Sequence, residues 1–195
     1  MTESFHILVI CLGNVCRSPL AERLLRLRFE ENLGAGSTAL HVSSAGVRAL
    51  VDSDIDESAA AELVRLGGDP SDFYSRQVTG ALAGSADLVL TATRAQRSRV
   101  LEEAPRALKR TFTIREFAAL TAIPPRPGQV IGTPADLVTH AASWRGSADI
   151  EEYDVPDPIG KNADVHRAVA DVLDAACSVI AEAITIALLS DVSPR

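Results

Sequence analysis

Apolar and polar residues alternate along this chain of 195 residues in blocks that predict strands interleaved with helices. Strands are expected at residues 5–10, 40–45, 86–92 and 111–114, and the continuous apolar run at 86–92 suggests burial on both faces of a sheet. Helices are expected at residues 19–33, 58–66, 94–103 and 161–189; apolar residues recur at helical spacing in the first and the last, and Pro105 marks the end of the third. This alternation predicts an α/β fold, a doubly wound four-stranded parallel sheet with helices on both faces.

Proline and glycine break the pattern between residues 123 and 149. We expect this segment to be a long excursion on the surface, with a short helix near residues 135–142. The length of the chain suits one full core. We therefore expect residues 1–195 to form a single domain that carries 123–149 as an extra surface segment.

The loop after the first predicted strand holds the most specific chemistry in the chain. Its residues are Cys11, Leu12, Gly13, Asn14, Val15, Cys16, Arg17 and Ser18. A loop between a strand and a helix binds phosphate readily, because backbone N–H groups converge there and the helix N-terminus favours negative charge. Ser18 has the residue type of an N-cap and Pro19 suits the first helical position, so we expect the helix to begin here.

Cys11 and Arg17 give this loop the parts of a phosphoryl-transfer site. The dipoles that bind an anion, together with Arg17, also favour the thiolate form of Cys11, which is the nucleophilic form. A guanidinium group can hold two phosphate oxygens at once. The alternative is an ordinary strand-to-helix turn in which Cys11 is a small buried hydrophobic side chain.

Composition narrows the partners and the surroundings. The net charge is −7 and the basic residues are spread along the chain, which makes nucleic acid a poor candidate partner. Three cysteines form no disulfide framework, which favours a reducing cytoplasm. The start of the chain lacks the charged region of a signal peptide, and the apolar run at 183–189 is too short for membrane insertion. The four histidines show no metal-ligand spacing, so no metal is expected.

Residues 11–19, Cys-Leu-Gly-Asn-Val-Cys-Arg-Ser-Pro, resemble the active-site signature of the low-molecular-weight protein tyrosine phosphatases. Further segments resemble this family in the right order, at residues 42–46, 75–79, 86–90 and 156–160. The resemblance covers nearly the whole chain except residues 123–149, and it is closer to the bacterial members. It implies the fold predicted above and a phosphatase that hydrolyses protein phosphotyrosine through a phosphocysteine intermediate.

The resemblance implies a role for each site residue. Cys11 would be the nucleophile, Arg17 would clamp the phosphate, and Asp157 would protonate the leaving oxygen and then activate water. The phosphate would be bound by Leu12, Gly13, Asn14, Val15, Cys16, Arg17 and Ser18, and the loop would be supported by Asn14, Ser18 and Ser44. No metal or other cofactor is implied.

The local sequence gives the role of Asp157 as general acid only partial support. Asp157 precedes a proline, so its backbone is extended, which suits a carboxylate aimed into a cleft. The alternative is that Asp157 only shapes the turn before the last helix. Asp154 is a rival acid that lacks the Asp-Pro context.

Several positions depart from the family pattern. Ile159 and Leu50 stand where the family usually places aromatic residues around the pocket, and Phe73 replaces a common histidine. We therefore expect the chemistry to be retained and the preference for phosphotyrosine to be weaker. Cys16 is either a redox partner of Cys11 or a packed side chain, and Cys177 is expected in the core.

Two other functions remain open. Arsenate reductase shares the fold, but its thioredoxin-coupled form needs downstream redox cysteines, and none lies between Cys16 and Cys177. The second is a non-catalytic module that binds phosphoproteins without turnover, against which the presence of Cys11, Arg17 and Asp157 together argues. The resemblance implies a phosphotyrosine protein as substrate, with a bacterial tyrosine kinase as a candidate, and the oligomeric state is left open.

Overall fold

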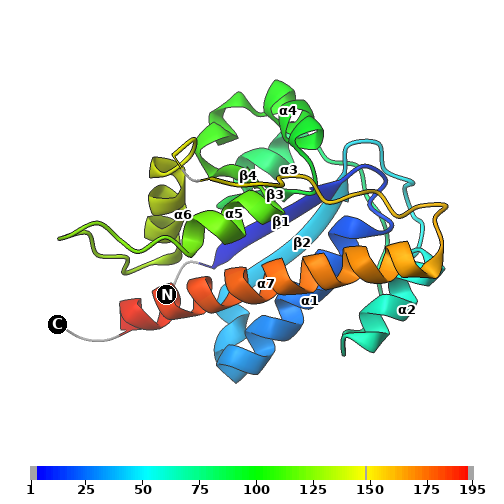
Figure 1. Ribbon diagram of the computed structural model, residues 1–195, viewed down its shortest axis with the longest axis horizontal. Coiled ribbons are helices and arrows are strands. Elements are labelled where there is room, and N and C mark those ends of the chain that lie inside the picture. The colour runs from blue at the N-terminus through cyan, green and yellow to red at the C-terminus, as the bar shows by residue number, and fades with distance from the viewer. Residues whose placement is uncertain (1–3, 148, 193–195) are drawn as a thin grey trace.

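The computed structural model describes residues 4–147 and 149–192. Its strands are β1 (Phe5–Cys11), β2 (Leu40–Gly46), β3 (Leu88–Thr91) and β4 (Thr111–Thr113). They pair in parallel in the order β2-β1-β3-β4, and β1 lies at the centre of the molecule (Figure 1). The predicted four-stranded parallel sheet is confirmed.

Helices cover both faces of this sheet, as predicted. The α-helices are α1 (Arg17–Leu33), α2 (Glu57–Arg65), α3 (Gly80–Ser85), α4 (Arg94–Glu103), α5 (Ile114–Thr121), α6 (Pro134–Ser143) and α7 (Ala163–Val192), and the 3-10 helices are η1 (Gly34–Ala39) and η2 (Pro105–Arg110). Ile7 and Val9 of β1 pack in the core cluster that contains α1, α5 and α7. Leu8 and Ile10 pack in a second cluster with α3 and α4. Because side chains alternate along a strand, burial on both faces produces the continuous apolar run seen in the sequence.

Two of the described α-helices were not predicted. The α3 sequence is short and has glycine at two of its six positions, which weakens the helical pattern. The α5 helix begins at Ile114, which the apolar run had assigned to the fourth strand. Its start is defined by a capping box, in which the Thr113 hydroxyl accepts from the Glu116 backbone N–H and the Glu116 carboxylate accepts from the Thr113 N–H.

The segment 123–149 is more deeply packed than predicted. Its helix α6 buries Leu137, Val138 and Ala141 in the main core cluster, beside α5 and α7. The buried His140 ring is 2.9 Å from the carbonyl oxygen of Ile123. The prediction of a surface excursion is therefore wrong for α6. Its apolar side chains recur at helical spacing and pack in the core, although proline and glycine flank the helix.

The long helix α7 is apolar enough, by length and composition alone, to cross a membrane. In the structure it runs along α1 across one face of the molecule (Figure 1). Val169, Leu173 and Ile180 are among its buried side chains. Packing against the core accounts for its composition, as expected for a core helix.

Candidate active site

The loop between β1 and α1 surrounds the Cys11 sulfur with hydrogen-bond donors. The backbone N–H of Asn14 donates to Cys11 Sγ at 3.3 Å, and the Ser18 hydroxyl donates to the same sulfur at 3.0 Å. Each contact points a positive hydrogen at the sulfur, which is the arrangement expected around a cysteine nucleophile. The prediction of Ser18 as N-cap is wrong: α1 begins at Arg17, Cys16 is the N-cap, and the Ser18 hydroxyl is directed at Cys11.

Asn14 holds the loop in a conformation that few residues adopt. Its φ is 56°, in the left-handed region, which asparagine tolerates better than most residues. Its side-chain amide donates to the hydroxyls of Ser18 and Ser44, each at 2.9 Å, and its side-chain oxygen accepts from the Arg76 backbone N–H at 2.8 Å. The three predicted support residues, Asn14, Ser18 and Ser44, thus form one connected network.

The network extends to a residue that the sequence did not single out. The Ser44 hydroxyl donates to Glu22 at 2.5 Å, and Glu22 is ion-paired with Arg26 at 2.8 Å. Glu22 is only 5% exposed although it is acidic. Nothing in its helix distinguished it from the other acidic positions, because its partner Ser44 lies on a different strand.

Arg17 and Asp157 meet at the edge of the loop. One terminal nitrogen of Arg17 lies 2.6 Å from the Asp157 carboxylate, and the other donates to the Val155 carbonyl at 3.0 Å. The Arg17 side chain is buried, whereas that of Asp157 is 41% exposed. Within the described residues, the buried Nε–H of Arg17 has no hydrogen-bond partner, so this donor is free to bind a phosphate oxygen.

A cavity of about 220 Å³ brings the three proposed catalytic residues together. It is lined by Cys11, Leu12, Gly13, Val15, Cys16, Arg17, Arg48, Leu50, Asp157 and Ile159. Asn14, Ser18 and Ser44 are buried around the loop and do not line it. Arg48 is a lining residue that the sequence analysis missed, since nothing in its local sequence linked it to the loop. Among the residues that the structure describes, no aromatic ring lines the cavity, in agreement with the departures noted at Leu50 and Ile159.

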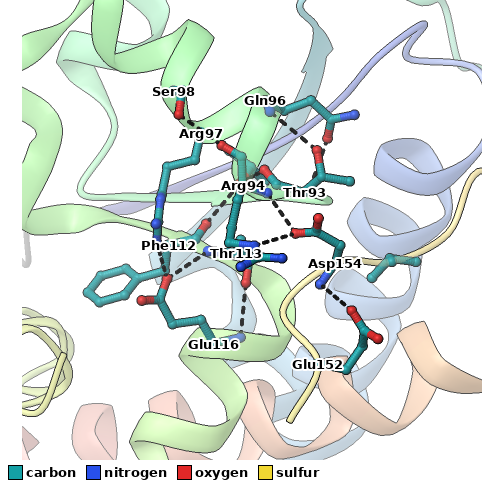
Figure 2. Close-up of polar contacts among 12 residues, drawn as sticks. Thr93, Arg94, Gln96, Arg97, Ser98, Phe112, Thr113, Glu116, Glu152 and Asp154 are labelled. Carbon is teal, nitrogen blue, oxygen red and sulfur yellow. Dashed lines mark hydrogen bonds and ion pairs between the residues drawn. The ribbon is translucent and has the colours of Figure 1, made fainter. Parts of the chain in front are cut away.

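Asp154, the rival acid, has a different environment. Its carboxylate accepts from the Arg94 backbone N–H at 2.8 Å, and the Arg94 side chain approaches the same oxygen at 3.4 Å. Figure 2 shows Asp154 directed at Arg94 near the start of α4. The Arg94 guanidinium also lies over the Tyr153 ring, 5.1 Å from its centre. Asp154 is therefore engaged at a helix N-terminus and does not line the cavity.

The other two cysteines are poor nucleophiles. Burial, reinforced by the nearby charge of Asp56, raises the pKa of the Cys16 thiol to about 12. Cys177 is fully buried in the core, as expected, and burial raises the pKa of its thiol as well. Both thiols stay protonated near neutral pH, which leaves Cys11 as the candidate nucleophile.

A cysteine and an arginine in a strand-to-helix loop of a parallel sheet form the architecture of a cysteine-dependent phosphatase. The family model described as low molecular weight phosphotyrosine protein phosphatase matches residues 6–123. The chain belongs to this family.

Curated relatives align with more than half of the chain. The low molecular weight protein-tyrosine-phosphatase Wzb of Salmonella typhimurium is 33% identical over 169 residues, covering 86% of each protein. Ptp of Acinetobacter johnsonii is 32% identical over 109 residues, covering 56% of this chain and 71% of that protein.

Solved structures agree with this assignment. The arginine phosphatase YwlE from Geobacillus stearothermophilus has a TM-score of 0.72 and 26% identity, over 98% of this chain and 99% of that one. The tyrosine phosphatase Wzb from Escherichia coli K30, in complex with sulphate, has a TM-score of 0.67 and 27% identity. The match covers 91% of this chain and 96% of that one.

Proposed function

We propose that this protein hydrolyses phosphotyrosine in proteins through a phosphocysteine intermediate on Cys11. The observation that carries the proposal is the shared cavity, in which Cys11, with two donors on its sulfur, lies with Arg17 and Asp157. The site lies at the carboxyl end of β1, where ligands of parallel sheets usually bind. We also propose that residues 1–195 act as one phosphatase domain.

The chemistry follows from the roles of three side chains. The Cys11 thiolate attacks phosphorus while Arg17 and the loop N–H groups hold the equatorial oxygens. Asp157 gives its proton to the leaving phenolic oxygen, so the P–O bond breaks as the P–S bond forms. The Asp157 carboxylate then takes a proton from water, which attacks phosphorus, releases inorganic phosphate and regenerates the thiolate.

This mechanism assigns no step to a cofactor. The loop amides and Arg17 supply the electrostatic stabilisation that a metal ion would otherwise provide. We propose the loop residues Leu12, Gly13, Val15 and Cys16 as phosphate ligands through their backbone N–H groups, alongside Asn14, Arg17 and Ser18.

The names of the relatives suggest the kind of substrate and the location. Wzb and the probable phosphatase EpsP are named as protein-tyrosine-phosphatases of bacteria. We propose a phosphorylated protein as the substrate, with a bacterial tyrosine kinase as the candidate, and the reducing cytoplasm as the location. A reducing location would keep Cys11 in the thiol and thiolate forms.

A second substrate is favoured by a specific observation. YwlE is described as an arginine phosphatase, and its structure matches nearly the whole chain. The cavity walls here are aliphatic, with Leu12, Leu50 and Ile159 around Cys11. An aliphatic wall suits the chain of phosphoarginine at least as well as an aromatic ring, and Asp157 would then protonate the leaving guanidine nitrogen.

The test is direct. The purified protein is assayed first with p-nitrophenyl phosphate, and then with one peptide carrying phosphotyrosine, phosphoarginine or phosphoserine. Turnover with the highest kcat/KM on phosphotyrosine supports the proposal, and a preference for phosphoarginine supports the second candidate. Binding without turnover would mark a phosphoprotein-binding module, and arsenate-dependent oxidation of a thiol cofactor would mark a reductase.

A further inference from the structure

Three side chains able to bind metals meet beside the phosphate loop. Cys16 is the N-cap of α1, Asp56 is the N-cap of α2, and His166 lies in the first turn of α7. Their ligand atoms lie within 4.8 Å of one another. The three residues are far apart in sequence, which is why the spacing of the histidines gave no sign of a site.

The donors are too far apart to bond to each other and close enough to share an ion. His166 Nδ1 is 3.9 Å from Asp56 Oδ1, beyond hydrogen-bond distance. Two ligands on a tetrahedral zinc ion lie about 3.3–3.6 Å apart, given metal–ligand distances of about 2.0–2.3 Å. Small changes in side-chain torsions would bring the donors to this spacing.

The donors are available for a ligand. Among residues 4–147 and 149–192, neither the Cys16 sulfur nor the His166 ring makes a hydrogen bond. Cys16 and His166 are 3% and 5% exposed, and the Asp56 side chain, 33% exposed, forms the side open to solvent. The His166 ring faces Asp56 Oδ1 at 3.9 Å, and this oxygen also accepts from the Ala59 backbone N–H at 3.2 Å as the cap of α2.

The donor set has a chemical preference. A thiolate, an imidazole and a carboxylate together suit zinc and similar divalent transition metals, and are poorly matched to calcium or magnesium. A zinc ion with a Cys16 thiolate, a neutral His166 and an ionised Asp56 has no net charge. A neutral cluster is the form that a largely buried site tolerates.

We propose that Cys16, Asp56 and His166 bind one zinc-type divalent cation, with a water molecule as the fourth ligand. On binding, the Cys16 thiol releases its proton to solvent and its sulfur bonds to the metal, while His166 donates a nitrogen lone pair. The ion would tie the phosphate loop to the N-termini of α2 and α7. Because it binds only the folded chain, it would raise the melting temperature.

The experiment uses cobalt as a spectroscopic probe and zinc as its competitor. The whole protein is titrated with Co²⁺ under reducing conditions, and one equivalent is expected to produce a thiolate-to-cobalt charge-transfer band that zinc removes. Cys16→Ser should abolish the band, and His166→Gln, which removes a direct ligand, should weaken cobalt binding by more than the roughly tenfold loss expected for an outer-shell partner. His41→Gln, which removes a histidine remote from the cluster, is the matched control and should bind as the unmodified protein does.

The decisive arm is Cys11→Ser. The band should persist in this variant, and zinc should still raise its melting temperature. A band that disappears with Cys11 and survives in Cys16→Ser would overturn the proposal, as would the absence of a band. If His166→Gln fails to fold, Asp56→Asn, which retains a helix-capping oxygen, replaces it. None of these measurements requires phosphatase activity, so this proposal and the proposed function fail independently.

Discussion

Arg17 and Asp157 are 140 positions apart in the chain, yet their side chains contact each other at 2.6 Å. The contact joins the group proposed to clamp the phosphate to the group proposed to protonate the leaving oxygen. A bound phosphate would compete with the carboxylate for the guanidinium. Asp157, which is the more exposed partner, would then be displaced toward the leaving group at the mouth of the cavity.

The proposed acid can be tested against its neighbour. Asp157→Ala should lower kcat by about 10²–10⁴ for a phosphotyrosine peptide, because the phenolate must then leave without a proton. The loss should be smaller for p-nitrophenyl phosphate, whose leaving group needs less help. Asp154→Ala is the matched control: it removes the contact with Arg94 and should leave kcat close to that of the unmodified protein. A larger loss from Asp154→Ala would show that the acid has been misassigned.

The nucleophile has an equally close control. Cys11→Ser should abolish turnover while the fold is retained, because a serine hydroxyl is not ionised near neutral pH. Cys177→Ser, in the core of α7, should leave kcat unchanged and lower only the stability. Steady-state kinetics with circular dichroism separate the two effects. Residual turnover in Cys11→Ser at the level of Cys177→Ser would exclude Cys11.

Oxidation of the loop should depend on pH. Peroxide should convert Cys11 to a sulfenic acid, whose sulfur the Cys16 thiolate then attacks; the S–S bond forms as the S–O bond breaks, and the hydroxide released takes a proton from solvent. Since the pKa of Cys16 is raised to about 12, its thiolate fraction below that pH rises about tenfold with each pH unit. The disulfide should therefore form faster as the pH rises from 7 to 9, as peptide mapping at fixed times would measure. A rate that does not change with pH, or a cross-link to Cys177, would contradict this account.

The conformation of Asn14 can be separated from its hydrogen bonds. Asn14→Gly keeps the left-handed backbone accessible but removes three side-chain hydrogen bonds, each worth about 0.5–1.5 kcal/mol. Asn14→Ala loses the same bonds and adds a conformational cost of about 1 kcal/mol or more. Urea unfolding should therefore rank the unmodified protein above Asn14→Gly, and Asn14→Gly above Asn14→Ala. Equal stability of the two variants would show that the backbone conformation costs nothing.

The sequence predicted the central strands and α4 well because burial on both faces gives a continuous apolar run, and because Pro105 marks where α4 must stop. The Arg94–Glu103 helix was predicted to the residue. The sequence also indicated the loop after β1 as the site, since cysteine, glycine, asparagine and arginine stand together there. The short helix α3 was missed because two glycines hide its pattern, and α5 was missed because it starts directly after a strand.

The rest of the site depends on contacts between distant segments. Glu22 reaches the loop only through Ser44 on β2, and Arg48 reaches the cavity from the loop that follows β2. The grouping of Cys16 with Asp56 and His166 likewise depends on how the N-termini of three helices converge. The periodicity of a single segment cannot predict contacts between residues that are distant in the sequence.

Specificity should follow from the walls of the cavity. Leu50 and Ile159 are 59% and 46% exposed, and they present aliphatic surface where an aromatic ring would stack on phosphotyrosine. Stacking is worth about 0.5–1.5 kcal/mol beyond the area buried, so its absence should lower kcat/KM on phosphotyrosine peptides by up to about tenfold. Ile159→Tyr should recover part of this loss, and Ile159→Leu, which changes shape without adding a ring, is its control.

The same comparison tests the depth of the site. Cys11 is only 2% exposed at the base of the loop, so the short side chain of phosphoserine would have to bury peptide backbone to reach it. The phosphotyrosine version of a peptide should therefore be hydrolysed with a higher kcat/KM than the phosphoserine version, in the unmodified protein and more strongly in Ile159→Tyr. A preference for phosphoserine would exclude phosphotyrosine as the substrate even if Cys11 proves to be the nucleophile.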